Sequence, residues 1–341
     1  MINDKDDVDV SIIIVTYNSK KYLVNCLNSI YNQEQGNYSF EIIIVDNASS
    51  DGTVQHLRSN FTQLRILENH LNKGYGQANN LGVKHARGNI IVFLNPDTVV
   101  KELWLENLIK PLVGSKKIIT TPKVLKLDGK INSCGLIVHF TGLGFTRGLN
   151  LSSDNFDDCE EVNGVTGCCF AIAKTDFLEL GFDENFFLYM EDVDLSWRIH
   201  LKNFKILYVP NSVIMHDYNL KVPLNKIYLL ERNRLIILRK YFSLKHFVIL
   251  LPSLILTEII TTIYSFKFGF KGFKYKIDAF KDGLFVEVEK IEGDEKRLFN
   301  SLDAEIPVDQ LTYGRIEELF KVISNLIFKL NYKIYAKINN I

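Results

Sequence analysis

The chain has 341 residues, and its 40 basic side chains balance its 40 acidic ones, so the formal net charge is zero. This balance argues against a general nucleic-acid binder, which needs a clear excess of positive charge. The length and the hydrophobic fraction of 47% predict a globular protein with a sizeable core, built as two domains or as one large domain with an extension.

Two features of the sequence bear on the cell compartment. The N-terminal stretch MINDKDDVDV is acidic and has no apolar run, so we expect no signal peptide. The cysteines are odd in number and show no CxxC or zinc-like spacing, which favours reduced thiols in a cytosolic protein. The five are Cys26, Cys134, Cys159, Cys168 and Cys169.

The first hundred residues alternate apolar runs with segments of helical periodicity. The apolar runs predict strands over 10–18, 40–46, 64–70 and 89–97, and the segments between them predict helices over 20–33, 53–61 and 74–87. Apolar strands separated by helices are typical of a mostly parallel sheet covered by helices on both faces. We therefore expect an α/β fold, which binds ligands at the carboxyl ends of its strands.

Polar residues follow three of these predicted strands. They are Thr16-Tyr17-Asn18, Asp46-Asn47 and Asn95-Pro96-Asp97. No GxGxxG or GxxxxGK[ST] motif follows the first strand, which argues against a nicotinamide-dependent dehydrogenase or a P-loop NTPase. Carboxylates such as Asp46, Asp51 and Asp97 can instead accept hydrogen bonds from a base or ribose, or ligate a divalent cation that bridges a diphosphate. The alternative for Asp46 and Asp51 is helix capping and turn formation.

The remainder of the chain divides near residue 225. Residues 115–225 are less regular, with a helix predicted from Met190 and a strand predicted to end at His216. From 226 the composition becomes helical, and an amphipathic helix is predicted over 313–334.

The stretch 247–266 is nearly all apolar and about long enough to span a bilayer. Glu258 and Pro252 interrupt it, and lysine and arginine flank both of its ends. Two basic flanks favour a segment whose ends both face an anionic cytoplasmic leaflet, so we expect an interfacial or re-entrant element around 241–281 rather than a span. A spanning helix and a buried helix that covers the first domain are the alternatives.

Four stretches resemble the successive nucleotide-sugar motifs of family 2 glycosyltransferases with the GT-A fold: VSIIIVTYNSKKYL, IIIVDNASSDGT, NKGYGQANNLG and VFLNPDT. With NPD in place of Asp-x-Asp, the chain is similar to the rhamnosyltransferase-like branch. The resemblance covers residues 9–220. It implies a GT-A catalytic domain over 1–225, with a nucleotide-sugar half at 9–115 and an acceptor half at 116–225, followed by a helical C-terminal region at 226–341.

The resemblance also implies roles for particular residues. Those expected to bind the donor nucleotide and sugar are Thr16, Tyr17, Asn18, Asp46, Asn47, Lys73, Gly74, Asn79, Asn95 and Asp97. Asp97 and His216 are expected to hold Mn²⁺ or Mg²⁺, which accept mixed oxygen and nitrogen ligands. Asn95 departs from the stricter motif, because an amide does not supply the charge of a carboxylate.

The stretch FDENFFLYMEDVDLSWRI (182–199) resembles the family's Glu-Asp motif at the start of a helix. The resemblance assigns Asp192 as the general base that takes the proton of the acceptor hydroxyl, and Glu191 as the residue that orients it or binds acceptor. The alternative is a pair of first-turn carboxylates favoured by the helix dipole.

Three more residues are assigned to the acceptor or the diphosphate. Gly167, in NGVTGCCFAIAK, lies in a stretch that resembles the acceptor-side segment, and a turn before a buried strand is its alternative. Arg232 and Arg234, in ERNR, are expected to neutralise the leaving diphosphate or an acceptor pyrophosphate, and a solvated helix face is their alternative.

We therefore predict an inverting, metal-dependent glycosyltransferase. It would transfer a sugar from a nucleoside-diphosphate sugar to a glycan or lipid-linked glycan at the cytoplasmic membrane surface, in cell-envelope polysaccharide synthesis or protein glycosylation. A nucleotidyltransferase on a similar sheet would need a glycine-rich loop after the first strand, and TYNSKKY has no glycine. An inactive membrane-associated scaffold is the other alternative, and the intact Glu191, Asp192, Asp97 and His216 argue against it.

Overall fold

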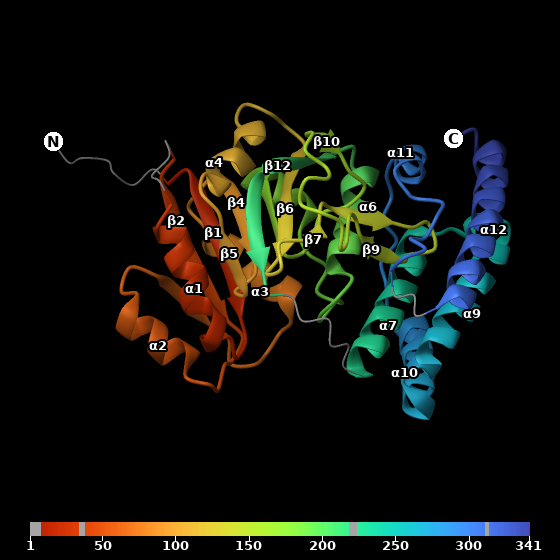
Figure 1. The fold of residues 1–341 in the computed structure, drawn as a ribbon, viewed down its shortest axis with the longest axis horizontal. Coiled ribbons are helices and arrows are strands. Elements are labelled where there is room, and N and C mark those ends of the chain that lie inside the picture. Colours follow the sequence, from red (N-terminus) through yellow and green to blue (C-terminus); the bar gives the residue numbers. More distant parts are fainter. Residues whose placement is uncertain (1–7, 34–37, 218–223, 311–313) are drawn as a thin grey trace. The chain divides into compact units, whose positions relative to one another are not determined.

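The computed structural model describes residues 8–33, 38–217, 224–310 and 314–341 (Figure 1). The chain forms two compact units. The N-terminal unit comprises Met1–Leu136, Thr146–Leu195 and Phe204–Asn219, and the C-terminal unit comprises Ile137–Phe145, Ser196–Asn203 and Leu220–Ile341. Two short segments of the expected 1–225 domain thus belong to the C-terminal unit. Their aromatic side chains pack there: Phe140 contacts Phe328, and Trp197 contacts Tyr241.

The N-terminal unit is built on one mixed sheet. Its order is β10-β12-β6-β11-β4-β1-β2-β3, with β5 paired to β12 and β7 paired to β6. The strands are β1 (Val10–Thr16), β2 (Phe40–Asp46), β3 (Arg65–Glu68), β4 (Ile90–Leu94), β5 (Thr98–Val100), β6 (Ile118–Lys126), β7 (Ile131–Ser133), β10 (Glu160–Glu161), β11 (Cys169–Ala173) and β12 (Lys205–His216). β4, β1, β2 and β3 run parallel, and β11 runs antiparallel to both β4 and β6. The predicted α/β fold is confirmed.

Helices cover both faces of this sheet. They are α1 (Lys20–Tyr31), α2 (Thr53–Asn60), α3 (Tyr75–His85), α4 (Trp104–Ile109), α5 (Lys174–Leu180) and the first turns of α6 (Glu191–Leu201), and a short 3-10 helix spans Lys110–Leu112. Ile12 and Ile14 of β1 pack with α1 and α4 in one hydrophobic cluster. Ile13 points to the opposite face, where α3 lies so close that a Cβ on Gly82 would come within 2.6 Å of its Cγ2 atom. Burial on both faces explains why the strands are apolar without alternation.

The sheet brings distant polar residues to one edge. Thr16 and Asp46 are register partners at the carboxyl ends of β1 and β2. β4 runs parallel to β1, so Asn95-Pro96-Asp97 follows at the same edge. The chain then turns into β5, which pairs antiparallel with β12 and sets Thr98 opposite His216. This pairing places His216 next to Asp97.

The C-terminal unit is mainly helical. Its helices are α7 (Leu224–Tyr241), α8 (Leu244–Ile249), α9 (Leu251–Phe266), α10 (Gly269–Phe285), α11 (Glu295–Asn300) and α12 (Arg315–Asn339). The small sheet of β8 (Leu136–Val138) and β9 (Gly144–Thr146) carries the hairpin tip that belongs to this unit. α10 packs on α7 and α9, and α12 packs on α9.

The apolar stretch 247–266 is not one helix. α8 ends at Ile249, and Pro252 lies in the first turn of α9, where its missing N–H costs nothing. Among the helices that the structure describes, none is long and apolar enough to cross a membrane.

Candidate active site

The ends of β1 and β2 hold two buried polar atoms without a partner. Asp46 is 2% exposed, and its Oδ2 atom accepts a hydrogen bond of 2.9 Å from the Ser49 N–H. Its Oδ1 atom and the Thr16 Oγ1 atom are buried and have no hydrogen-bond partner. Burying a polar atom without a partner costs about 1–3 kcal/mol, so such atoms point to a ligand that satisfies them.

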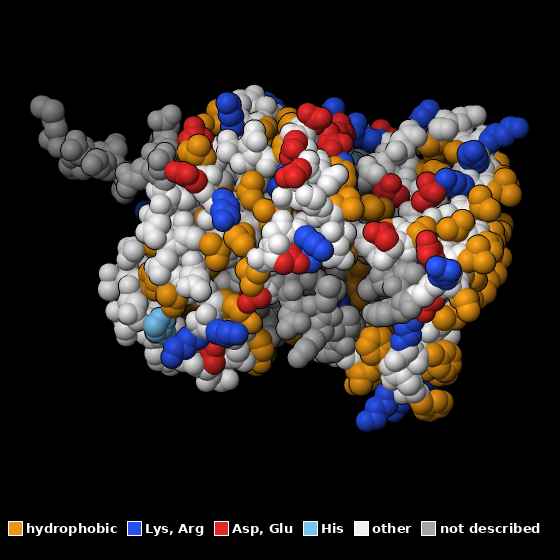
Figure 2. Space-filling view, viewed as in Figure 1, with side chains coloured by type: hydrophobic (Ala, Val, Ile, Leu, Met, Phe, Trp, Pro, Cys, Tyr) orange, Lys and Arg blue, Asp and Glu red, His pale blue; other side chains and the backbone are white. Residues whose placement is uncertain are grey.

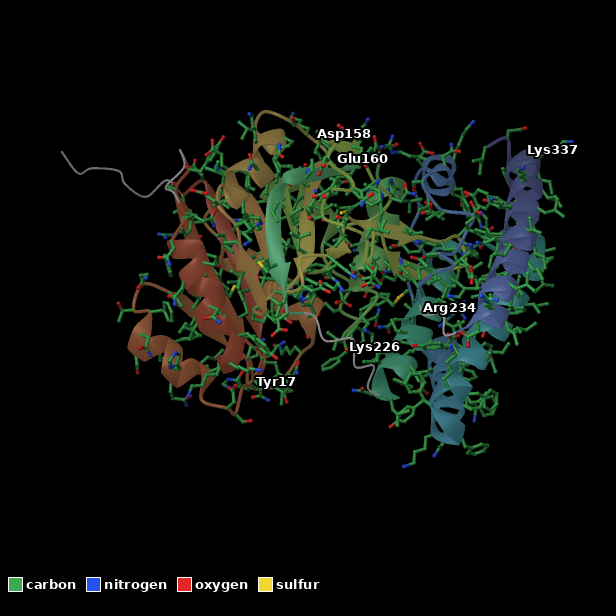
Figure 3. All side chains as sticks on the ribbon, viewed as in Figure 1. Tyr17, Asp158, Glu160, Lys226, Arg234 and Lys337 are labelled. Carbon is green, nitrogen blue, oxygen red and sulfur yellow. The ribbon has the colours of Figure 1, made fainter. Side chains whose placement is uncertain are left out.

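The loop after β1 supplies one exposed ring and one loop-forming amide. Tyr17 is 51% exposed at the carboxyl end of β1 (Figure 3). Asn18 adopts a positive φ of 52°. Its Oδ1 atom accepts the Ser50 N–H at 2.8 Å, and its own N–H donates to Ser49 Oγ at 2.8 Å. Asn18 therefore fixes the loop that follows β2.

Asn47, Gly74 and Asn79 shape the loop before α3. Asn47 Nδ2 donates to the Gly74 carbonyl at 3.0 Å, and Asn79 Nδ2 donates to the Tyr75 carbonyl at 3.1 Å. Gly74 has a φ of +83°, and a Cβ there would collide with the Phe187 carbonyl, so only glycine fits. These three predicted donor-binding residues hold the backbone in place, whereas Lys73 beside them is exposed.

Asp97 and His216 lie together as the sequence predicts. Asp97 Oδ1 is 3.2 Å from His216 Nε2, and the other ring nitrogen, Nδ1, lies 3.1 Å from Asn132 Oδ1. An amide oxygen only accepts, so the proton of Nδ1 points to Asn132 and Nε2 faces Asp97. Burial by itself lowers the pKa of His216, but the neighbouring Cys168 and Asp97 raise it well above its usual range.

This pair fits a divalent cation when His216 is deprotonated, because the metal takes the place of the proton on Nε2. Two ligands in adjacent octahedral positions, each about 2.1 Å from Mg²⁺, lie about 3 Å apart, close to the spacing of Asp97 Oδ1 and His216 Nε2. Within the described ranges no group of three or more His, Cys, Asp or Glu side chains could hold a metal. Asn95 is half-buried beside the pair, and its N–H donates to the Cys168 carbonyl at 2.9 Å.

A tight turn presents the carboxylates of Glu191 and Asp192 at the start of α6. Tyr189 and Met190 both have positive φ, of 65° and 70°. Each such residue stores about 1–3 kcal/mol of strain, which is common at functional sites. The turn buries Glu191 to 8% exposure and leaves its Oε2 atom without a partner. Burial and the adjacent charge of Asp192 raise the pKa of Glu191 to about 8. At neutral pH Glu191 therefore keeps its proton.

Gly167 and Tyr75 hold Asp192. The Gly167 N–H donates to Asp192 Oδ2 at 3.2 Å, and the Tyr75 hydroxyl donates to the Gly167 carbonyl at 2.6 Å. A Cβ on Gly167 would lie 3.2 Å from the same carboxylate oxygen. Burial and the nearby Glu191 carboxyl raise the pKa of Tyr75 well above its usual range, so its hydroxyl keeps its proton.

The structure places Arg234 in the interior of the C-terminal unit, where the labelled side chain lies among the helices (Figure 3). It is 1% exposed and pairs with Glu231 at 2.6 Å and with Glu258. Lys276 completes this buried ionic cluster, with Nζ 2.9 Å from each carboxylate. The expectation that Arg234 faces a diphosphate is wrong, because two carboxylates and the Thr141 carbonyl enclose its guanidinium. The cluster also explains how Glu258 is tolerated in an apolar segment.

Arg232 differs from Arg234. It is half-buried, and its Nη1 donates to Asn233 Oδ1 at 2.9 Å.

Sequence reasoning missed two residues of the N-terminal unit. Tyr75 follows Gly74 within NKGYGQANNLG, so its position in this motif could have identified it as a candidate site residue. Asn132 lies on β7 in the irregular region, and nothing in the sequence connects it to His216.

A cavity of about 420 Å³ opens at the amino ends of β2 and β3, lined in part by Tyr31, Glu41 and Arg65. None of the predicted site residues lines this cavity, so it is distinct from the candidate active site.

Comparison with known proteins places these strand ends in a known family. A family model described as glycosyl transferase family 2 matches residues 11–181. Glycosyltransferase AglE of Haloferax volcanii is 32% identical over 109 residues, which are 31% of this chain and 36% of that protein. A protein of Methanococcus voltae is 25% identical over 280 residues, which are 75% of this chain and 84% of its own length. It is named dolichyl N-acetyl-alpha-D-glucosaminyl phosphate 3-beta-D-2,3-diacetamido-2,3-dideoxy-beta-D-glucuronosyltransferase.

Among solved structures, GalNAc-T7 with UDP, GalNAc and Mn²⁺ superposes with a TM-score of 0.60 at 18% identity, over 81% of this chain and 55% of that one. This likeness concerns the fold and agrees with the GT-A architecture.

Proposed function

Since the chain belongs to glycosyl transferase family 2, we propose that this glycosyltransferase is inverting and metal-dependent, and that its donor is a nucleoside-diphosphate sugar. One observation carries the proposal. The unpartnered Thr16 Oγ1 and Asp46 Oδ1 atoms lie at the same sheet edge as the Asp97–His216 pair. This edge offers hydrogen-bonding oxygen atoms for a nucleoside, and beside them it offers ligands for a cation.

The nucleoside would bind at the ends of β1 and β2. Asp46 Oδ1 would accept an N–H of the base or a ribose hydroxyl, which removes the cost of its burial. Thr16 Oγ1 would form a hydrogen bond with the same base or ribose group. The exposed ring of Tyr17 would contact the base. Asn18, Asn47, Gly74 and Asn79 would act by holding the loops around it.

Asp97 and His216 would hold Mn²⁺ or Mg²⁺, with Asn132 fixing the imidazole. When bound, the ion supplies positive charge that stabilises the departing diphosphate. Lys73, exposed after β3, would add positive charge to the same group. Asn95, in place of a second carboxylate, would leave the protein with one charged ligand at this position. Arg232 stays a candidate for diphosphate or acceptor contact.

Asp192 would act as the general base. It would take the proton of an acceptor hydroxyl while that oxygen attacks the anomeric carbon from the face opposite the diphosphate. The new C–O bond forms as the old one breaks, and the diphosphate leaves with the electron pair, so the configuration inverts. Glu191 keeps its proton at neutral pH because of burial and Asp192, so it would donate a hydrogen bond to the acceptor or its neighbour.

We place the reaction at the cytoplasmic membrane surface, with a glycan or lipid-linked glycan as acceptor. The dolichyl phosphate in the name of the Methanococcus voltae relative and the apolar segment at 241–281 support this. The Asn95-Pro96-Asp97 motif supports membership in the rhamnosyltransferase-like branch.

The full chain, incubated with UDP-, GDP- and dTDP-sugars and with membranes as the source of acceptor, tests the proposal. We expect one donor class to release nucleoside diphosphate with Mn²⁺ or Mg²⁺ and not with EDTA. Equal release in EDTA would refute metal dependence, and product NMR that shows a retained anomeric configuration would refute inversion. No turnover of any donor would overturn the proposal.

A further inference from the structure

Two helices of the C-terminal unit carry rows of exposed aliphatic side chains. We call them together the aliphatic face, which consists of Leu251, Ile255, Ile259 and Ile263 of α9 and Leu319, Ile323, Leu326, Leu330 and Ile334 of α12. Each is between 46% and 64% exposed. On both helices the members recur every three or four residues, so each row follows one side of its helix. Figure 2 shows such hydrophobic side chains gathered along α12.

The contact between α9 and α12 includes buried, hydrogen-bonded polar side chains. Asn331 of α12 accepts a hydrogen bond of 2.6 Å from Ser253 of α9 and donates one of 2.9 Å to the Ile249 carbonyl. Ser253 is 0% exposed, and Thr257, one turn further along α9, is also 0% exposed. The aliphatic face lies outside this hydrogen-bonded contact.

The size of the aliphatic face argues for a partner. The row from Leu319 to Ile334 on α12 alone is about 22 Å long at 1.5 Å per residue. Soluble monomers rarely expose contiguous apolar patches of more than a few hundred Å², so a surface of this kind is normally covered. A bilayer surface, a second copy of the chain and another protein are the three possible covers.

Charge favours an anionic bilayer. Lys333 and Lys337 of α12 are exposed beside the aliphatic row, whereas the acidic residues of α12 are confined to its first turn. Lys337 is labelled near the end of α12 in Figure 3. Anionic headgroups would pair with these lysines, at about 1 kcal/mol per residue.

We propose that the aliphatic face of α9 and α12 lies in the headgroup–acyl boundary of an anionic bilayer, with Lys333 and Lys337 at the headgroups. This rests on the membrane-surface location in the proposed function and extends it from residues 241–281 to α12. The two helices lie flat on the membrane, because each carries its exposed aliphatic side chains along one side.

Flotation of the full chain with phosphatidylcholine vesicles, with and without phosphatidylglycerol, tests this. The wild type should float with the anionic vesicles. Leu326→Glu/Leu330→Glu on α12 and Ile255→Glu/Ile259→Glu on α9 should each weaken binding by about tenfold or more, since each places two charges where two aliphatic side chains enter the bilayer. Lys333→Ala/Lys337→Ala should weaken binding to the anionic vesicles only.

Leu127→Glu/Leu178→Glu is the matched control, because these N-terminal-unit leucines are 59% and 64% exposed and lie outside the aliphatic face. It should bind as the wild type does. All variants should keep the wild-type circular dichroism and Tm, since the replaced side chains are already exposed.

If the α12 variant binds as the wild type does and the α9 variant does not, the extension to α12 is wrong and the membrane location stands. If the wild type binds no vesicle, both are wrong. A lipid-free dimer that the α12 variant converts to a monomer would assign the aliphatic face to a second copy. Donor turnover, measured on the same preparations, tests the catalytic proposal separately.

Discussion

The two units of the chain differ in how many hydrophobic side chains they expose and in how they accommodate buried carboxylates. Among the described residues the N-terminal unit exposes 8 large hydrophobic side chains and the C-terminal unit exposes 22. The N-terminal unit buries carboxylate oxygens of Asp46 and Glu191 without a partner, whereas the buried Glu231 of the C-terminal unit pairs with Arg234 and Lys276. Unpaired buried carboxylates mark where a ligand binds, and paired ones mark where the fold is held together.

Asp192→Asn gives the largest expected effect on the catalytic side of this comparison. An amide cannot take the acceptor proton, so kcat should fall by about 10²–10⁴-fold. Nucleotide binding, measured by titration calorimetry, should stay within error, because the nucleoside is proposed to bind Thr16 and Asp46, whereas Asp192 accepts a hydrogen bond from Gly167. Asp128→Asn, in an exposed turn, is the matched control. Full activity in Asp192→Asn would refute the assignment of the base.

Arg234→Met tests the structural side. It leaves Glu231 and Glu258 with one cation between them, and breaking a buried pair costs about 3–5 kcal/mol of unfolding free energy. Activity per folded molecule should be kept. Arg232→Met is the matched variant. It should lower kcat/KM and leave the free energy of unfolding in urea nearly unchanged. An Arg234→Met variant that is inactive but as stable as the wild type would refute the structural role of Arg234.

Tyr75→Phe tests whether the hydrogen bond from Tyr75 to Gly167 contributes to catalysis by positioning Asp192. The change removes the hydrogen bond to the Gly167 carbonyl and frees the segment that holds the carboxylate. We expect kcat to fall about tenfold with the donor KM unchanged, because the effect passes through positioning. Tyr31→Phe, whose ring lines the cavity at the opposite sheet edge, is the control. An altered donor KM would place Tyr75 in substrate binding instead.

Glu191→Gln gives the smallest effect, on stability. The pKa of Glu191 is about 8 in the folded protein against 4.5 for a free glutamate, so the folded state holds a proton that the unfolded chain has lost. Stability from this group therefore falls as pH rises from about 4.5 to about 8. The glutamine variant should have a higher Tm than the wild type at pH 8 and an unchanged Tm at pH 4, measured by calorimetry. The same Tm difference at both pH values would show that Glu191 does not titrate in this range.

Much of the N-terminal unit could be predicted from the sequence. β1, β2 and β4 lie within the apolar runs expected as strands, because burial on both faces leaves a local signal. The structure of the C-terminal unit was harder to predict from the sequence. The apolar stretch 247–266 contains parts of two helices that meet at Leu250, and Glu258 pairs with Arg234 and Lys276, which come from other helices.

The sequence by itself determined which polar residues close the strands, since each follows directly from an apolar run that must be buried. The tertiary structure decided which of them meet. Asp97 reaches His216 because β5 pairs with β12, and two hydrogen bonds through Gly167 link Asp192 to Tyr75. It also decided which side of α9 and α12 is exposed, because the packing of these helices buries Ser253, Thr257 and Asn331. Contacts of this kind depend on register and helix packing between distant segments, which no local pattern encodes.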